Sequence, residues 1–584
     1  MIDYKKLGLK VGIEIHQRLA TKTKLFCNCP AEISENEKRV FEFSRKLRPT
    51  SSEIGEVDKA TMSEFLKGKE FVYYFYPNCC SVETDSQFPR ELNEEALIIS
   101  LQLAKMLHMQ IPDEIQIMRK IVIDGSNTTG YQRTALIAMG NEKSFIETEF
   151  GKVYLQELEL EEESAAKVRE EENKIYYRLD RLGIPLIELS CHPDIWHPKQ
   201  AKEFASKIGQ LLRSLKVQRG IGTVRQDVNI SIREGRRIEI KGFQDLRNLD
   251  KLVENEVKRQ LDLISIKKTL KGAKIKFEQR DVTNLFKKSN CELLKTLSKE
   301  KILCLKIENF SGFFKKKCGN LTLGKEIANY AKFFQINGFI HSDEDLKKYG
   351  LHSKEIDMLK KEMEIKEKDL FLLIGGKKCE LALELIKKRI LFLKEGVPEE
   401  TRYASGLNTR YARELPGAAR MYLETDLPKV NVKKYLDNIE LPETLEDKAK
   451  KFQKLGLNRE LAEQITKSLE LNLFEEFLKY KVEPKIIADL ILNKKKFLER
   501  AGYKIEKKDL EFVLKNLEKG KITKKSVSDV LIKKSIRGFE KISGEELKKI
   551  VLEFKKKHKE KAMEELMKKY GKRVESEEVL KLLN

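Results

Sequence analysis

Long apolar segments are absent from this sequence. It has no run of about 18 apolar residues, the length that a membrane-crossing helix requires. Its first residues, MIDYKKLG, lack the apolar core of a secretory signal peptide. Proline is scarce, with 13 among 584 residues, whereas 40% of the residues are hydrophobic and 36% are charged. We therefore expect a folded cytoplasmic protein of about four domains.

Cysteine is also sparse, and its distribution argues against a disulfide framework. Five of the nine cysteines are scattered along the chain. The other four form two close pairs, Cys27 with Cys29 and Cys79 with Cys80. Four thiolates are enough for a structural zinc ion, although CxC and adjacent cysteines strain a single tetrahedron. Buried free thiols in a reducing cytosol are the alternative.

Common nucleotide-binding and nucleophile motifs are missing. The sequence contains neither a GxxxxGK(S/T) loop nor a dinucleotide-binding GxGxxG, which excludes the commonest nucleotide folds. It offers no convincing glutaminase or amidase nucleophile either. Cys191 next to His192 does not make one by adjacency alone.

Positive charge is abundant. The chain carries 115 Lys and Arg against 93 Asp and Glu, a formal net charge of +22. Such an excess favours polyanionic partners, nucleic acid first. The alternative is a lysine-rich proteome, or a thermophile with surface ion-pair networks.

The character of the sequence changes along the chain. Up to about residue 268, strand-like stretches such as DVNISIR alternate with helices, one of them capped by Asn93. The following stretch, to about residue 398, alternates short strands with lysine-rich helices and looks like an inserted module. Residues 396–428 are rich in Gly, Pro and Arg and predict a loop laid against another surface. The remainder is nearly all helical.

Several predicted strands combine an apolar face with a polar one. In KVGIEIHQRL, period-2 alternation places Glu14 and His16 on the same face. Glu162 in LELEEESAAK, Glu188 in GIPLIELS and Arg225 in VRQDVNISIR extend the pattern. One such strand is an ordinary solvated edge. Four in one domain favour a concave sheet whose acids hold a divalent metal, with basic groups nearby for phosphates.

The ligand types constrain the metal. Glu14 and Glu188 are the most specific signals, because an ionised group among apolar residues must be paired or metal-bound if it is buried. Magnesium prefers oxygen ligands, whereas His16 would suit manganese or zinc better. We therefore expect His16 to act through a bound water or to lie at the edge of the site.

Many stretches match one protein family. They are GLKVGIEIHQRL, KLFCNCP, RPTSSEIGEVDKA, MRKIVIDGSNTTGYQRTALIA, DRLGIPLIELSCHPD, VRQDVNISI, IEIKGFQDL and ETRYASGLNTRYARELPGAARMYLETDLP. In order and content they strongly resemble the E subunit of the archaeal glutamyl-tRNA(Gln) amidotransferases, which is related to the bacterial B subunit. The resemblance spans most of residues 1–430.

The resemblance implies an α+β fold with a mixed-sheet cradle domain, an inserted α/β domain like that of bacterial aspartyl-tRNA synthetase, and all-helical C-terminal domains. The expected boundaries are 1–268 and 399–432 for the cradle, 269–398 for the insertion, 433–520 for a helical domain and 521–584 for a helical tail that binds tRNA. Residues 501–584 hold 24 Lys and Arg against 15 Asp and Glu, which suits phosphate contacts, although a solvated helical surface is the alternative.

The implied reaction amidates a misacylated tRNA. The side-chain carboxylate of tRNA-bound glutamate attacks the γ-phosphate of ATP, and ammonia then displaces the acyl phosphate. Magnesium, or manganese, would bridge the phosphate oxygens. Carried over position by position, the catalytic and metal residues are Glu14, His16, Glu162 and Glu188. The family usually has two acids followed by Asp, whereas this chain has three glutamates, 161–163, followed by Ser164. Which of these glutamates faces the metal is therefore open by one register.

Basic groups and partners complete the expectation. Arg119, Lys120, Arg225 and Lys241 are candidates for stabilising phosphate charge. The resemblance implies an asparaginase-like partner, the D subunit, that supplies ammonia, two copies of both chains, and tRNA(Gln) charged with glutamate. Some relatives of the bacterial B subunit hold zinc through cysteines in the region of Cys27, Cys29, Cys79 and Cys80. A non-catalytic tRNA-binding factor that kept the fold, and a protein of the bacterial type with other partners, are the alternatives.

Overall fold

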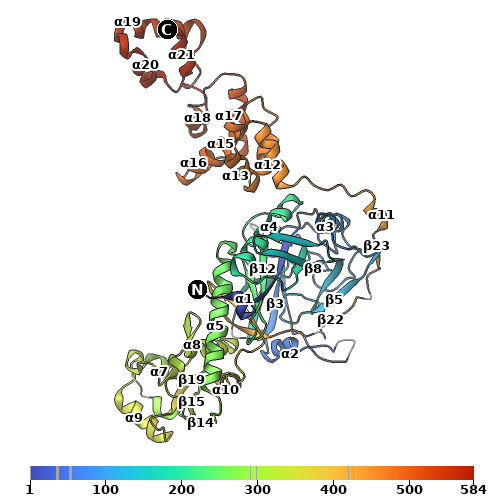
Figure 1. The fold of residues 1–584 in the computed structure, drawn as a ribbon, viewed down its shortest axis with the longest axis vertical. Helices are drawn as coiled ribbons and strands as arrows, with labels where there is room; N and C mark the ends of the chain where they lie inside the picture. The colour runs from blue at the N-terminus through green and yellow to red at the C-terminus, as the bar shows by residue number, and fades with distance from the viewer. Residues whose placement is uncertain are drawn as a thin grey trace. The chain divides into compact units, whose positions relative to one another are not determined.

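The computed structural model describes residues 2–34, 38–51, 55–171, 173–287, 289, 291–297, 299–417, 420–424 and 426–583. The chain forms two compact units, Met1–Pro442 and Glu443–Asn584 (Figure 1). The first contains β-sheets and helices, and the second is helical. The predicted α+β class is confirmed.

A mixed sheet of eleven strands dominates the first unit (Figure 1). Strand β1 (Lys10–Arg18) lies in its middle, antiparallel to both β11 (Pro185–Cys191) and β12 (Val224–Ser231). The order is β21-β20-β13-β12-β1-β11-β8-β6-β5-β22, and β7 pairs with β8. The remaining strands are β5 (Ile117–Ile121), β6 (Tyr131–Met139), β7 (Phe145–Thr148), β8 (Gly151–Glu162), β13 (Ile238–Phe243), β20 (Glu400–Ser405), β21 (Asn408–Glu414) and β22 (Met421–Leu423).

Helices cover one face of this sheet. Ile13 and Ile15 of β1 are buried in a core shared with α3 (Glu94–Met106), α4 (Pro198–Ser214) and α5 (Leu249–Thr269). Strand alternation then turns the side chains between them to the opposite face. Local signals fix the helix starts: the Asn93 side chain accepts a hydrogen bond from the Ala96 amide at 2.8 Å, and α4 begins at a proline.

A smaller sheet stands beside the large one, in the order β2-β3-β10-β9. Aromatic residues form its core, among them Phe71, Tyr73 and Tyr177. Its strands and the neighbouring short elements are β2 (Phe41–Arg45), β3 (Glu70–Phe75), β9 (Ala166–Glu170), β10 (Lys174–Arg178), α1 (Tyr4–Leu7), α2 (Lys59–Leu66), β4 (Glu114–Ile115), β23 (Val430–Asn431) and α11 (Lys433–Leu436).

Between α5 and β20 the chain builds a separate four-stranded sheet in the order β14-β15-β19-β18 (Figure 1). Every residue of β15 (Ile302–Ile307) and β19 (Leu370–Gly375) is buried, as expected for strands covered on both faces. The other elements of this segment are β14 (Phe277–Asp281), α6 (Thr283–Phe286), α7 (Glu292–Leu297), β16 (Lys317–Cys318), β17 (Leu321–Thr322), α8 (Leu323–Ala331), β18 (Ile340–His341), α9 (Ser353–Glu362) and α10 (Cys379–Phe392).

The predicted loop over residues 396–428 is wrong where the chain forms β20, β21 and the short strand β22, which pairs with β5. Strands β20 and β21 form a hairpin there, and β20 pairs in parallel with β13. The buried side chains of Thr401 and Arg402 hold β20 in place, because Thr401 bonds Glu239 and Arg402 bonds Thr409. The abundance of arginine suggested an exposed loop, but Arg402 is fully buried in a polar network.

The second unit consists of short helices around two apolar clusters. One cluster spans residues 445–531 and the other spans 542–579. In the described part of the chain no helix is both long and apolar enough to cross a membrane. The helices are α12 (Leu445–Lys454), α13 (Arg459–Lys467), α14 (Leu471–Phe477), α15 (Pro484–Asp489), α16 (Lys496–Arg500), α17 (Lys507–Glu518), α18 (Val527–Lys533), α19 (Gly544–His558), α20 (Ala562–Tyr570) and α21 (Ser576–Leu583).

Candidate active site and cysteine cluster

The polar face of β1 is the centre of the candidate active site. In the antiparallel pairing with β11, His16 lies opposite Glu188. In the pairing with β12, Glu14 lies opposite Asp227, and His16 lies opposite Arg225. Three adjacent strands therefore present acids and bases on one face, as the alternation in the sequence predicts.

The first group of ligand-type atoms surrounds His16. Its Nε2 lies 3.3 Å from the Glu188 carboxylate and 4.0 Å from that of Glu161. Lys120 donates hydrogen bonds to the same two carboxylates, at 3.3 Å and 3.1 Å, and to Glu159 at 3.4 Å. The group is a partly buried ammonium enclosed by three carboxylates, with an imidazole at its side.

The second group lies on the other side of β1. Glu14, Asp227 and Glu239 each bring a carboxylate oxygen within 4.8 Å of the others. Lys241 donates to Asp227 at 2.8 Å and lies 2.6 Å from Glu239. The Asn229 amide donates to Glu14 at 3.0 Å. This group therefore repeats the first in its chemistry, with several acids around one lysine.

Crowding of carboxylates shifts their protonation. Burial and the Glu188 carboxylate raise the pKa of Glu14 to about 7. Burial likewise raises the pKa of Glu159 to about 7, although Lys120 acts in the opposite direction. Burial would also raise the pKa of Glu188, but Lys120 and His16 hold it well below its usual range. Glu188 is thus the anionic centre, and its neighbours share the excess charge.

This donor set suits a divalent cation. Six carboxylates face two lysines and one histidine, so negative charge is in excess, and magnesium and manganese take oxygen ligands of this kind. His16 Nδ1 is also buried and has no hydrogen-bond partner in the described part of the chain. His16, Glu161 and Glu188 could hold one ion, and Glu14, Asp227 and Glu239 a second.

The placement of Glu162 differs from the expectation. Its carboxylate accepts hydrogen bonds from the Arg133 amide at 3.0 Å and from the Arg133 guanidinium at 3.4 Å, away from His16. The reason is the strand period, since Glu161 and Glu162 point to opposite faces of β8. Leu158 and Leu160 are fully buried, which leaves Glu159 and Glu161 on the polar face. This alternation is visible in LELEE, so the sequence contained the signal.

Of the four predicted phosphate-binding residues, two lie inside the carboxylate groups, one lies beside them and one points away. Lys120 and Lys241 lie inside the two carboxylate groups. Arg225 lies beside them, and its Nη1 donates to both oxygens of Glu163, at 3.0 Å each. Arg119 points away and pairs with Glu424 instead.

Arg119 and Lys120 are neighbours in β5 and therefore point to opposite faces, so Arg119 lies away from the carboxylate groups. The structure adds three acids that the sequence did not assign to the site, namely Glu159, Asp227 and Glu239, and of the glutamates left open it places Glu161 beside His16.

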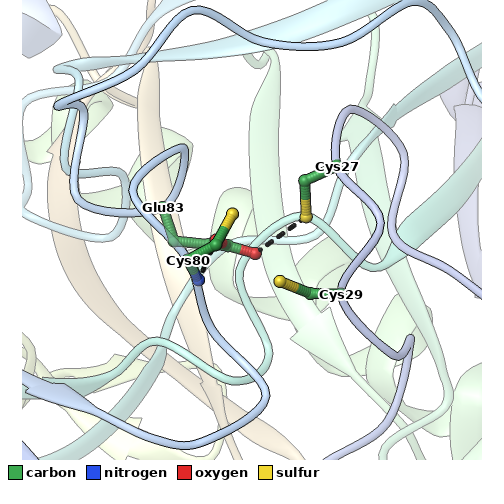
Figure 2. Close-up of side chains that lie close together, drawn as sticks. All are labelled: Cys27, Cys29, Cys80 and Glu83. Carbon is green, nitrogen blue, oxygen red and sulfur yellow. Dashed lines mark hydrogen bonds between the residues drawn. The ribbon is translucent and has the colours of Figure 1, made fainter.

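A separate cluster joins two loops near the smaller sheet (Figure 2). Ligand atoms of Cys27, Cys29, Cys80 and Glu83 lie within 4.8 Å of one another. Glu83 accepts hydrogen bonds from the Cys27 thiol at 3.1 Å and from the Cys80 amide at 2.8 Å. Hydrogen bonding with Cys27 lowers the pKa of Cys29 to about 7.

Cys79, the fourth cysteine of the expected zinc set, lies outside this group. It is buried, its thiol faces Asn78 at 4.0 Å, and burial raises its pKa to about 12. Glu83 occupies the fourth position in the cluster and also pairs with buried Lys24, 2.8 Å away. Adjacent residues in an extended turn face different ways, so Cys79 and Cys80 do not act together.

Comparison with known proteins identifies the family. Residues 9–437 match the family described as the GatB/GatE catalytic domain. Proteins named as the E subunit of glutamyl-tRNA(Gln) amidotransferase are similar over most of their length. The one from Archaeoglobus fulgidus is 44% identical, covering 91% of this chain and 87% of its own. Those from Methanocaldococcus jannaschii and Sulfolobus acidocaldarius are 42% identical, covering 98% and 94% of this chain and 95% and 91% of their own. The chain therefore belongs to the GatB/GatE family, as its motifs indicate.

Proposed function

We propose that this chain is the catalytic component of a glutamyl-tRNA(Gln) amidotransferase, a carbon–nitrogen ligase that converts glutamyl-tRNA(Gln) to glutaminyl-tRNA(Gln) for translation in the cytoplasm. The observation that supports this proposal is the two carboxylate–lysine groups beside β1, one around His16 toward β11 and one around Glu14 toward β12. A factor that only bound tRNA would have no use for buried acids of this number, since each costs desolvation energy.

The reaction has two steps. The glutamate side chain attacks the γ-phosphorus of ATP, and the bond from that phosphorus to the bridging oxygen breaks, which releases ADP. Ammonia then attacks the carbonyl carbon of the acyl phosphate, phosphate leaves, and the amide nitrogen loses a proton. Magnesium or manganese, when bound, neutralises charge on the phosphate oxygens.

The protein's own groups position and balance this chemistry. His16, Glu161 and Glu188 would hold one ion, and Glu14, Asp227 and Glu239 a second. Lys120 and Lys241 lie among these acids and are placed to pair with phosphate oxygens once an ion takes over the carboxylates. Burial of the site also keeps water from the acyl phosphate, which would otherwise be hydrolysed.

The ammonia is proposed to come from an asparaginase-like partner, the D subunit, with two copies of both chains in the assembly. This chain lacks a recognisable amide-hydrolysing nucleophile of its own. This chain would then activate the glutamate, and the partner would release the ammonia.

The helical unit is proposed to contact the tRNA. Residues 501–584 carry nine more basic than acidic side chains, 24 against 15. Such contacts to phosphates provide affinity that decreases steeply with salt.

A structural zinc ion is proposed for the cysteine cluster. Three sulfur ligands, from Cys27, Cys29 and Cys80, with a carboxylate oxygen from Glu83, make a four-ligand set of the kind zinc accepts. The lowered pKa of Cys29 favours the thiolate that such an ion needs. The ion would join the loops after β1 and β3.

One experiment separates the enzyme from a binding factor. The isolated chain is incubated with ATP, magnesium, free ammonium and glutamyl-tRNA(Gln), and the aminoacyl ester is analysed by mass. We expect glutaminyl-tRNA together with stoichiometric ADP and phosphate, without the ammonia-supplying partner. Binding of the tRNA without ADP formation or product would overturn the proposal in favour of the non-catalytic alternative.

A further inference from the structure

A cavity of about 380 Å³ lies away from both carboxylate groups, between helices α8 and α10 and the β20–β21 hairpin. Its lining residues are all different from those of the candidate active site. Apolar side chains form much of its wall, namely Leu385, Phe392, Pro398 and Tyr411. Its volume falls within the range of small-molecule sites, about 300–1,000 Å³.

A buried cation with unused donors forms part of this wall. Arg389 is 4% exposed, and its Nε donates to the Tyr330 hydroxyl at 2.9 Å. Its Nη1 and Nη2 are buried and have no hydrogen-bond partner among the described residues. Buried polar atoms are nearly always hydrogen-bonded, and an unpaired guanidinium is among the costliest exceptions.

The acid that bonds the same tyrosine hydroxyl does not supply the missing partner. One oxygen of Glu400 accepts a hydrogen bond from Tyr330 at 2.6 Å, and the other pairs with Arg402. Arg402 pairs in turn with Glu326. The neighbouring ionic groups therefore satisfy each other, and the outer edge of the Arg389 guanidinium remains without an acceptor among the residues that the structure describes.

We propose that Arg389 binds the carboxylate of a small apolar monocarboxylate that fills this cavity. The planar fork of a guanidinium matches the two oxygens of a carboxylate. Leu385, Arg389 and Phe392 lie at positions i, i+4 and i+7 of α10, hence on one helix face, so the apolar body of the ligand would pack beside the fork. Nη1 and Nη2 are closed to solvent in this structure, so a ligand reaches them only if side chains of the wall move, and Leu385 and Phe392 of that wall are half-buried.

The charge around the cavity selects the class of anion. Glu399 and Glu414 line it together with Glu400, and each of them repels a second negative charge. Arg236 lies 3.8 Å from Glu399 and Lys388 lies 3.3 Å from Glu414, so these two cations offset the charge of Glu399 and Glu414. Because Arg389 is then the cation left to balance a ligand, the site favours a monoanion over a phosphate dianion.

The test uses the full chain and three probes of similar size: phenylacetate, its neutral analogue 2-phenylethanol, and phenyl phosphate. Binding is measured by ligand-observed NMR and titration calorimetry. We expect saturable binding of phenylacetate in the millimolar range or tighter, and binding at least about tenfold weaker for the other two, since a charge-assisted hydrogen bond is lost or a charge is repelled. Equal binding of the acid and the alcohol, tighter binding of phenyl phosphate, or no saturable binding of phenylacetate would overturn the proposal.

Variants tie the binding to the cavity. Arg389→Met should abolish phenylacetate binding, whereas Lys394→Met removes the same charge from an exposed position that does not line the cavity and should leave binding intact. Leu385→Trp fills the cavity but keeps Arg389, so it should also block binding in a protein whose circular dichroism spectrum is unchanged. Retained binding in either Arg389→Met or Leu385→Trp contradicts the assignment, so the test holds even if the other variant folds poorly.

Discussion

His16 on β1 lies directly opposite Glu188 on β11, and its Nε2 is 3.3 Å from the Glu188 carboxylate. That carboxylate also accepts a hydrogen bond from Lys120. Glu188 therefore joins an imidazole and an ammonium group, and it is the acid whose pKa is held lowest in this group. Three strands far apart in sequence meet at this one side chain.

The placement of Glu161 leads to a first prediction. Glu161→Gln should lower phosphate release from ATP by at least about 100-fold, because it removes an anionic ligand next to His16 and Lys120. Affinity for tRNA should change little, since the fold is retained. Phosphate release is measured with glutamyl-tRNA(Gln), magnesium and ammonium present. The control is Glu147→Gln, an exposed acid of β7; if both variants keep full turnover, Glu161 is not a ligand.

A second prediction concerns pH. Burial raises the folded-state pKa of Glu14 to about 7, above its value in the unfolded chain, so folding favours the protonated form. The metal-free protein should therefore lose stability as pH rises from about 4.5 to about 7. The free energy of unfolding is measured by urea denaturation across this range.

Glu14→Gln should flatten this pH dependence, and added magnesium should reduce it in the unmodified chain. Glu42→Gln, on the exposed strand β2, serves as the control and should behave like the unmodified protein. A profile that Glu14→Gln leaves unchanged would show that Glu14 is ionised in the folded protein at all these pH values.

The buried polar network gives a third prediction. Arg402 is fully buried and pairs with Glu326 at 2.9 Å and with Glu400. Arg402→Leu leaves both carboxylates short of a partner and should lower the free energy of unfolding by about 3–5 kcal/mol. Arg410→Leu, at an exposed position of β21, should change it by less than about 0.5 kcal/mol. Equal effects in urea denaturation would contradict the view that Arg402 stabilises the hairpin.

Metal content distinguishes the cysteines. Cys29→Ser should lose the zinc ion proposed for the cluster, whereas Cys79→Ser should keep it, because the Cys79 thiol faces Asn78. Zinc per chain is measured by atomic emission after purification without chelators. Loss of zinc from both variants would instead favour a site of four thiolates, and zinc absent from the unmodified chain would refute the site.

Salt dependence tests the role of the helical unit. Lys556→Gln combined with Lys557→Gln removes two exposed charges from the last turn of α19. If both contact phosphates, the slope of log K against log salt for tRNA binding should become shallower by about 1.4–1.8. The matched control, Lys347→Gln with Lys348→Gln, alters exposed lysines before α9. The same slope in both double variants would place the tRNA contacts elsewhere.

Several features of the site follow directly from strand alternation. Ile13 and Ile15 are buried, so Glu14 and His16 had to share the opposite face. The same reasoning applied to Leu158 and Leu160 selects Glu161 over Glu162. The comparison with the family by position suggested Glu162 and left the register open by one residue, and strand alternation places Glu161 on the face of His16.

Other features depend on contacts that no local pattern contains. Glu83 joins the cysteines only because the loops after β1 and β3 converge, some 56 positions apart between Cys27 and Glu83. Asp227 and Glu239 meet through the pairing of β12 with β13, whose register shifts at an irregularity. The β20–β21 hairpin was not predicted because Arg402 suggested an exposed loop. In the structure Arg402 is buried, since Glu326 of α8, 76 positions earlier, and Glu400 of β20 itself neutralise its charge.

The strand at one edge of the central sheet, β22, follows the insertion in the sequence. It pairs with β5, which precedes the insertion, and Arg119 of β5 bonds Glu424, 305 positions later. A ribosome adds about 5–20 residues per second. The nascent β5 edge therefore waits at least about 15 s for its partner strand at that rate, with its backbone groups open to wrong pairings. Newly made chains should depend on chaperones during this interval, because the inserted segment delays the synthesis of a strand that the sheet needs.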